Sequence, residues 1–171
     1  MQILKLSIVC LLFFGSLNGQ QLPNSESEEL KVLESILSNS NNSTTYYKTI
    51  IKDQKTPLTS YIEAYLLKFY LCINDIDSAS VIISDEEVNL LRQKFSKQKV
   101  KRIDKLLPKY KNRTTKKHER YKTGSISMPV TFRDGTMALY FSLSTYSGEF
   151  NLLRKKNDTW EKVCSNAVWI E

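Results

Sequence analysis

Apolar and polar residues alternate along residues 125–171, and this period of two indicates β-strands. The dipeptide Asp134-Gly135 interrupts the alternation and is typical of a two-residue type I′ hairpin turn, because glycine adopts positive φ freely. A two-residue loop there fixes the register of the hairpin. The predicted cross-strand pairs are all apolar: Phe132–Met137, Val130–Leu139, Met128–Phe141 and Ile126–Leu143.

Two further turn signals continue the alternation, at 145–148 and within 156–158. The register of the last hairpin depends on whether its loop has two or three residues. The expected pairs are Leu143–Phe150 and Phe141–Leu152 across the first loop, and Leu152–Val163 and Arg154–Glu161 across a two-residue loop at Asn157-Asp158. A short strand at 167–170 follows. We therefore expect an antiparallel meander with one apolar face, and Pro129, which lacks an N–H, on an edge strand.

Apolar residues recur at helical spacing in three segments upstream of this meander, namely 28–38, 58–73 and a segment that follows Ser84. Ser84 and the acidic residues after it are typical of a helix N-cap and first turn. Weaker helical spacing continues to Pro108, whereas 46–51 is apolar without a clear period. The expected fold class is α+β, with N-terminal helices packed on a C-terminal antiparallel β-meander of three to four strands.

Residues 1–19 have a short basic start, an apolar run and small residues at the end, which is typical of a secretory signal peptide. We expect residues 20–27 to form a flexible leader and 28–171 a single α+β domain. Within that domain we expect a helical part at 28–107, a basic linker at 108–123 and the meander at 125–171. No transmembrane span is expected after the signal peptide, and a lipid anchor at Cys10 is not expected either. The protein is therefore expected to be exported, to the periplasm or beyond.

Two cysteines, Cys72 and Cys164, follow the expected signal peptide. Either they form a disulfide in an oxidising compartment, or each is a buried thiol that behaves as a small apolar residue. The chain has a single histidine, His118, and no Cys–His spacing of a zinc site. We expect neither a metal nor another cofactor.

Residues 92–122, which we call the basic belt, contain fourteen Lys or Arg against only Asp104 and Glu119. This excess of twelve is larger than the formal charge of +7 for the whole chain, so the rest of the chain is net negative. Such segregation favours an anionic envelope component as partner. No specific nucleic acid is expected, because aromatic residues that stack on bases are sparse in the belt. The alternative is a solvated helix face followed by a loop. The candidate anion-binding residues are Lys97, Lys99, Lys101, Arg102, Lys105, Lys116, Lys117 and Arg120.

Recognisable catalytic motifs are missing from the sequence, which has no GxSxG elbow, P-loop, GxGxxG or HExxH. His118 lies among like charges in KKHER, and Cys164 has no histidine near it in sequence. These two residues are the ones to test if the protein is a small hydrolase.

The strand SISMPVTF, the strand MALYFSLS and the hairpin FNLLRKKNDTW together resemble the C-terminal module of small exported proteins of unknown function from Bacteroidetes bacteria. The stretch SDEEVNLLRQ is similar to the helix that precedes the sheet in that group. This chain has Asp158 where the group often has glycine, and it lacks a cysteine pair that some members carry in the sheet. The resemblance implies an exported α+β domain, and it implies no activity and no catalytic residues.

Three functions follow from these observations. The leading hypothesis is a non-catalytic binding or interaction module of the periplasm or cell surface, whose partner is another protein or an anionic envelope component. The second is a small hydrolase-type enzyme. The third is a binder of anionic envelope polymer through the basic belt.

Overall fold

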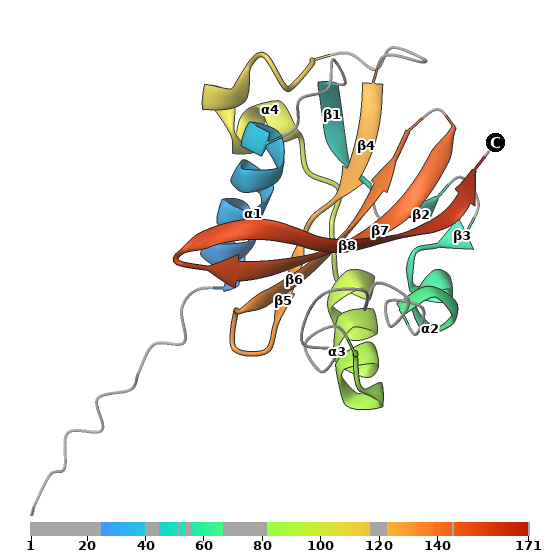
Figure 1. The fold of residues 1–171 in the computed structure, drawn as a ribbon. Coiled ribbons are helices and arrows are strands. Elements are labelled where there is room, and N and C mark those ends of the chain that lie inside the picture. The colour runs from blue at the N-terminus through green and yellow to red at the C-terminus, as the bar shows by residue number, and fades with distance from the viewer. Residues whose placement is uncertain are drawn as a thin grey trace, which may run out of the picture.

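The computed structural model describes residues 25–39, 45–50, 52–53, 56–66, 82–116, 123–144 and 146–170 (Figure 1). The expected signal peptide at 1–19 lies outside these residues. The fold is α+β, as the sequence predicts, with helices packed on a six-stranded mixed sheet in the order β1-β4-β6-β7-β8, where β5 also pairs with β6. The helices are α1 (Ser25–Asn39), α2 (Thr59–Leu66), α3 (Asp85–Ser96), α4 (Ile103–Leu106) and the 3-10 helix η3 (Pro108–Tyr110). The strands are β1 (Thr45–Ile50), β4 (Thr123–Ser127), β5 (Val130–Phe132), β6 (Met137–Leu143), β7 (Ser147–Lys156) and β8 (Thr159–Ile170), and β2 (Lys52–Asp53) pairs separately with β3 (Thr56–Pro57).

The first predicted hairpin is confirmed close to its turn. Phe132 pairs with Met137 and Val130 pairs with Leu139. Asp134 and Gly135 have φ of 52° and 78°, as a type I′ turn requires. Arg133 before them also has a positive φ, 50°, so the left-handed stretch is one residue longer than the dipeptide predicts.

The prediction for the far end of this hairpin is wrong. Ile126 pairs with Ser142, rather than with Leu143 as the uninterrupted register requires. The slip of one residue occurs at Pro129, which cannot donate a ladder hydrogen bond. The side chain of Ser127 compensates, because its Oγ accepts a hydrogen bond from the backbone N–H of Phe141 at 2.8 Å. The strand is therefore divided into β4 and β5, and β5 pairs only with β6 among the described strands.

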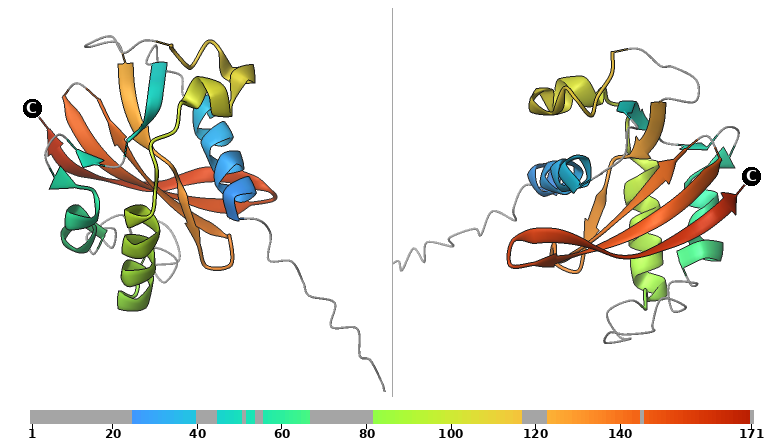
Figure 2. Two further views of the ribbon diagram at one scale, coloured as in Figure 1. Left: turned by 180° about the vertical axis from the view of Figure 1, so that it is seen from behind. Right: turned by 45° about the horizontal axis from the view of Figure 1, so that its top comes forward.

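The sheet has two apolar faces, where the sequence analysis expects one, and the slip places Ile126 and Met128 on the second of them. The first face packs on α2 and α3, and the second packs on α1 and α4. Figures 1 and 2 show α1 and α4 grouped apart from α2 and α3. The first face contains Val130, Phe132, Met137, Leu139, Phe141, Phe150, Leu152 and Cys164. The second contains Ile126, Met128, Ala138, Tyr140, Leu153 and Trp160.

The sheet is also wider than the predicted meander. The apolar stretch 46–51 supplies β1, which pairs with β4 in parallel and makes the sheet mixed. The chain after α3 then runs along β1, since Thr49 N donates to Lys101 O and Lys101 N donates to Thr49 Oγ1, both at 2.7 Å. The predicted basic linker includes η3 and a parallel bridge between Thr114 and Tyr46. These contacts tie the basic segment to the sheet.

The second predicted register is wrong by two residues, although each side chain keeps its face. Phe141 pairs with Phe150 and Leu143 pairs with Gly148. The loop closes early because Ser144 Oγ accepts hydrogen bonds from the backbone N–H groups of Tyr146 and Ser147, at 3.2 and 3.0 Å. A serine-centred turn thus replaces the longer loop that the sequence predicts.

The third hairpin has the two-residue loop, with φ of 48° at Asn157 and 60° at Asp158. The pair Arg154–Glu161 is confirmed, but a bulge pairs Leu152 with Cys164 rather than with Val163. Strand β8 is continuous to Ile170, so the separate short strand at 167–170 is part of it.

The helix ends follow local capping chemistry. Ser84 and Glu87 form a capping box at the start of α3, as the acidic first turn predicts. Helix α1 begins at Ser25, three residues before the predicted start and within the expected leader. Helix α2 begins at Thr59, one residue after the predicted start, and the predicted helical residues 67–73 lie outside the described part of the chain.

Candidate functional site, a lysine-lined pocket

A pocket of about 340 Å³ lies where the start of α1, the end of α3 and the break between β4 and β5 meet. We call it the lysine pocket. Its lining residues are Glu29, Lys94, Lys97, Gln98, Lys99, Lys101, Met128 and Val130. A volume in this range is sufficient for a small-molecule site or for one unit of a polymer.

The lysines of this pocket lie at the end of α3 and in the segment that follows it. The last residue of α3 is Ser96, and Lys97 is its C-cap residue. The following segment leaves the helix and reaches the edge of β1 at Lys101. Lysines occupy every second position at 97, 99 and 101, where Lys97 still has the helical backbone conformation and the chain beyond it leaves the helix. All three line the pocket.

Two side chains of α3 and its C-terminal extension bind the edge strand. Lys94 Nζ donates to the carbonyl oxygen of Thr131 at 2.6 Å, and Gln98 Nε2 donates to the carbonyl oxygen of Met128 at 2.6 Å. Carbonyl groups at a strand break need such partners, since an unpaired buried carbonyl destabilises the fold. Gln98 Oε1, by contrast, is buried and accepts no hydrogen bond from the part of the chain that the structure describes.

The floor of the lysine pocket is apolar. Met128 and Val130 are both buried there, one from each face of the sheet, because the chain slips at Pro129 between them. Four lysines surround this floor against one glutamate, Glu29, which leaves a formal excess of three positive charges. Lys97 and Lys99 are exposed, so their attraction for an anion weakens as salt increases.

The structure brings only part of the basic belt to this pocket. Of the eight candidate residues, it places Lys97, Lys99 and Lys101 there. Lys105 and Lys116 are exposed elsewhere on the surface. Lys117, Arg120 and His118 lie outside the described residues.

The candidate Arg102 has a structural role instead. Its guanidinium donates two hydrogen bonds to the carboxylate of Asp104, both at 2.8 Å, and lies 5.2 Å from the ring of Tyr47. The Arg102 hydrogen bonds hold the pKa of Asp104 below its ordinary value. Lys109 of η3 similarly pairs with Glu34 of α1 at 2.9 Å. These two basic residues of the belt are thus engaged in ion pairs, one within the first turn of α4 and one between η3 and α1.

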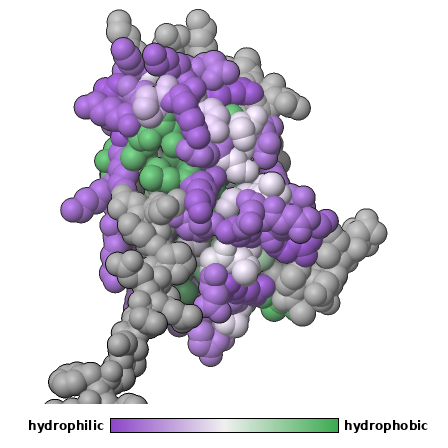
Figure 3. Space-filling view, turned by 90° about the vertical axis from the view of Figure 1, so that its left-hand side faces the viewer, coloured by the Kyte–Doolittle hydropathy of each residue, from purple (hydrophilic) through white to green (hydrophobic). Residues whose placement is uncertain are grey.

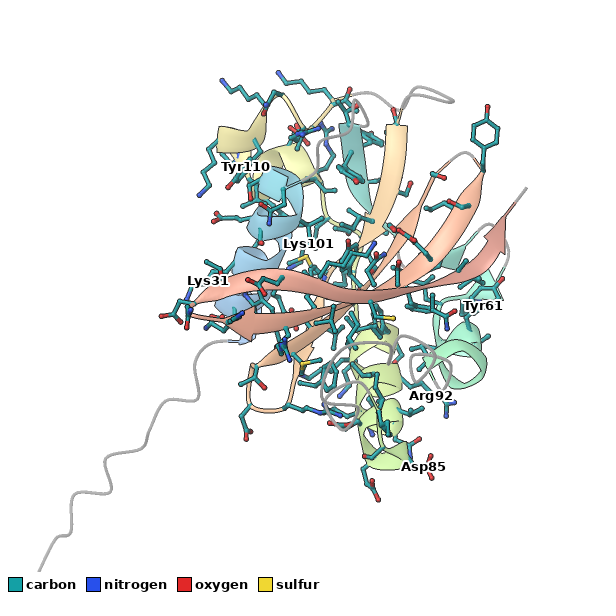
Figure 4. All side chains as sticks on the ribbon, viewed as in Figure 1. Lys31, Tyr61, Asp85, Arg92, Lys101 and Tyr110 are labelled. Carbon is teal, nitrogen blue, oxygen red and sulfur yellow. The ribbon has the colours of Figure 1, made fainter. Side chains whose placement is uncertain are left out.

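Described residues of the belt lie in two regions of the molecule. Lys101 and Tyr110 lie toward α1 and α4, whereas Arg92 lies on α3 at the other end of the molecule (Figure 4). The side of the molecule that carries α1 and α4 is mostly hydrophilic and also has an apolar patch (Figure 3), and Lys105 and Lys109 are exposed on α4 and η3.

Sequence reasoning missed Lys94, Gln98, Glu29 and the apolar floor. Lys94 lies three residues before Lys97, a spacing that places the two side chains on one helix face. Helical periodicity could therefore have predicted that Lys94 lies near Lys97. Glu29 and Met128 are far from the belt in sequence, and no local pattern connects them to it.

The described part of the chain shows no metal-binding cluster, and the candidate nucleophile Cys164 is not a free thiol. Cys164 is disulfide-bonded, which resolves the choice between a disulfide and a buried thiol and leaves it no thiolate for nucleophilic attack. Cys72, the cysteine that the sequence analysis pairs with Cys164 if a disulfide forms, lies outside the described residues. Among the described residues, no three or more His, Cys, Asp or Glu side chains come together as metal ligands. None of the described helices is both long and apolar enough to cross a membrane.

Comparison with protein-family models, with curated proteins and with solved structures gives no match to this chain.

Proposed function

We propose that this protein is an exported, non-catalytic binding protein that holds a segment of an anionic polysaccharide in the lysine pocket. The observation that carries the proposal is the group of lysines at alternate positions, 97, 99 and 101, around an apolar floor. An anionic polymer has charges at regular intervals, and a group of cations is complementary to such a ligand.

Two other features of the lysine pocket favour a sugar polymer over a simple anion. The buried Gln98 Oε1 is an acceptor without a partner among the described residues, and a sugar hydroxyl is a donor that satisfies it. Met128 and Val130 offer an apolar floor, on which the C–H face of a sugar ring can pack. An inorganic anion has no apolar surface that could make this contact.

The disulfide at Cys164 supports the exported location. Disulfides form and persist in oxidising compartments and are rare in the cytosol. An exported protein meets acidic polysaccharide in the cell envelope and meets little nucleic acid.

The test is a titration of the oxidised protein with a fluorescent heparin oligosaccharide, which serves as the anionic probe. The double variant Lys97→Gln/Lys99→Gln removes two exposed charges from the lysine pocket. We expect it to lower the affinity about tenfold at low salt, since each exposed ion pair contributes up to about 1 kcal/mol. The affinity of the parent protein should also fall as salt increases.

The matched control is Lys105→Gln/Lys116→Gln, which removes the same charge from exposed belt positions outside the pocket. The proposal predicts a much smaller loss of affinity in this control. Equal losses in the two double variants would mean that only net charge attracts the probe, and the pocket assignment would then be wrong. A parent protein that binds anionic lipid vesicles and not the oligosaccharide would replace polysaccharide by a membrane surface.

A further inference from the structure

A second pocket lies on the α1 side of the sheet, far along the chain from the lysines. Its volume is about 280 Å³, and it is enclosed by the second half of α1 and by strands β1, β6, β7 and β8. We call it the tyrosine pocket. Its lining residues are Ser35, Ile36, Asn39, Tyr46, Tyr140, Ser142, Glu149, Leu153, Trp160 and Lys162.

Strand alternation explains why polar groups gather there. Tyr140 and Ser142 on β6 point to the same face of the sheet, as do Glu149 and Asn151 on β7. Nearer the β7–β8 turn this face is covered by the apolar residues of α1. Helix α1 ends at Asn39, and from there the face carries polar side chains around an open space.

The two tyrosines are the largest polar groups of this pocket. Tyr140 is buried and lines this pocket together with Tyr46. Burial raises the pKa of Tyr140, and the neighbouring Tyr46 and Glu149 raise it further. Burial also raises the pKa of Tyr46. Both phenols therefore remain protonated, and each can donate a hydrogen bond to a ligand.

Two buried polar atoms in and beneath the pocket are unsatisfied. Trp160 is 4% exposed and lines the pocket, and its Nε1 donor has no partner among the described residues. Asn151 is 0% exposed, and no described residue donates a hydrogen bond to its Oδ1 acceptor. Its Nδ2 donates to Ser142 Oγ at 2.9 Å, which joins it to the lining of the pocket. Buried groups of this kind are rarely left unpaired in folded proteins, so an unexplained pair of them points to a ligand or to bound water.

The charges of the tyrosine pocket balance. Glu149 and Lys162 are its two ionised side chains, and their charged atoms are 3.8 Å apart. The pocket therefore has no net attraction for an anion or a cation. The remaining lining offers hydroxyl and amide groups together with the rings of Tyr46, Tyr140 and Trp160.

We propose that the tyrosine pocket is a second binding site, which takes one neutral sugar ring. A sugar ring supplies both donors and acceptors to the unpaired groups, and its C–H face packs on aromatic rings. The volume is close to the lower end of the usual range for small-molecule pockets and suits a single ring better than an extended chain. This inference does not depend on the lysine pocket.

The experiment uses the full oxidised protein and methyl β-D-glucopyranoside as the neutral probe, followed by ¹H–¹⁵N NMR. The chain has two tryptophans, so the indole N–H signal of Trp160 is assigned by its loss in Trp160→Phe. We expect this signal to shift in a saturable manner as the probe is added at millimolar concentrations. Cyclohexanol, a ring of similar size with a single hydroxyl, should bind at least about fivefold more weakly, because most of the hydrogen bonds are then missing.

Two variants and one control make the result specific. Tyr140→Phe keeps the ring and removes the hydroxyl, and Glu149→Gln removes an acceptor charge at a partly exposed position. Each variant should lower the affinity for the probe about fivefold or more, and the rest of its amide spectrum should match that of the parent. Tyr146→Phe changes an exposed tyrosine outside the pocket and should bind as the parent does.

Three outcomes would overturn the inference. The first is a Trp160 signal that does not respond to the probe, and the second is a response equal to that of cyclohexanol. The third is unchanged binding in both Tyr140→Phe and Glu149→Gln. Binding that persists in Lys97→Gln/Lys99→Gln is expected, and it shows that the two sites are independent.

Discussion

Glu87 joins the start of α3 to the first hairpin turn, and its replacement by glutamine should loosen that junction. Glu87 Oε1 accepts a hydrogen bond from Arg133 Nε at 2.6 Å, and Oε2 accepts one from Arg133 Nη2 at 2.9 Å. Oε2 also accepts a hydrogen bond from the backbone N–H of Ser84 at 2.9 Å, which completes the capping box. The same guanidinium donates to the carbonyl oxygen of Ile82. Arg133, itself a turn residue with positive φ, thus joins the hairpin turn to the start of α3 and to the segment before it.

The expected loss of stability follows from these contacts. An exposed ion pair contributes at most about 1 kcal/mol, and a hydrogen bond to a charged group contributes about 1.5–3 kcal/mol when shielded from water. The side chains of Glu87 and Arg133 are 20% and 26% exposed, so the pair lies between these cases. Glutamine keeps one oxygen acceptor and loses the charge and the two-pronged geometry. We expect Glu87→Gln to reduce the free energy of unfolding by about 1–2 kcal/mol at neutral pH.

The dependence on pH has a definite sign. The hydrogen bonds from Arg133 hold the pKa of Glu87 below its ordinary value of 4.5, against the opposing effect of burial. The unfolded chain therefore binds a proton at a higher pH than the folded chain does. The stabilisation is complete above the unfolded pKa and is lost as the pH falls through the folded pKa. The difference between parent and Glu87→Gln should accordingly shrink as the pH drops below 4.5.

The assay is urea unfolding of the oxidised proteins at neutral pH and at several acidic pH values, with far-UV circular dichroism as the signal. Glu86→Gln is the matched control, because Glu86 is exposed in the same first turn and makes no contact with Arg133. Equal losses in the two glutamine variants would refute the reasoning, since helix-dipole and charge effects alone would then account for Glu87. A loss that persists undiminished in an Arg133→Gln background would refute it too.

Two further substitutions test the sheet. Phe141→Ala removes a fully buried ring that packs edge-on against Phe150, with 5.1 Å between the ring centroids. Urea unfolding should show that the free energy of unfolding falls by about 3–5 kcal/mol, and a fall of less than about 1 kcal/mol would contradict the assigned core. Asp158→Gly replaces an exposed turn residue with φ of 60°, and thermal unfolding should show a stability equal to the parent or higher by up to about 1 kcal/mol, because glycine adopts this conformation without strain. A clear loss there would mean that the exposed Lys155–Asp158 ion pair, at 3.5 Å, contributes more than such pairs usually do.

The candidate site was predictable only in part. Three of the eight predicted belt residues line the lysine pocket, because lysines close in sequence at the end of one helix also stay close in space. Arg102 was indistinguishable from them in sequence, and the structure shows it committed to Asp104. The tyrosine pocket combines residues from α1 and four strands, so no sequence window contains it. Within it, Tyr140 is buried beside residues of α1, a contact between segments about a hundred residues apart in the chain.

Features that depend on neighbours a few residues apart are encoded locally in the chain. The α+β class, the capping box at Ser84 and the turn at Asp134-Gly135 follow from local periodicity and backbone preference. The sequence also predicts the last hairpin but allows a loop of two or three residues, and the structure has two. The register slip beside Pro129, the parallel strand β1 and the second apolar face appear only in the folded chain. Each of these depends on contacts between distant segments, such as Ser127 with Phe141 or Thr49 with Lys101. Such contacts stabilise the fold but produce no periodic pattern of residues in the sequence. Because the strand slips at Pro129, Met128 and Val130 turn to opposite faces and together form the floor of the lysine pocket.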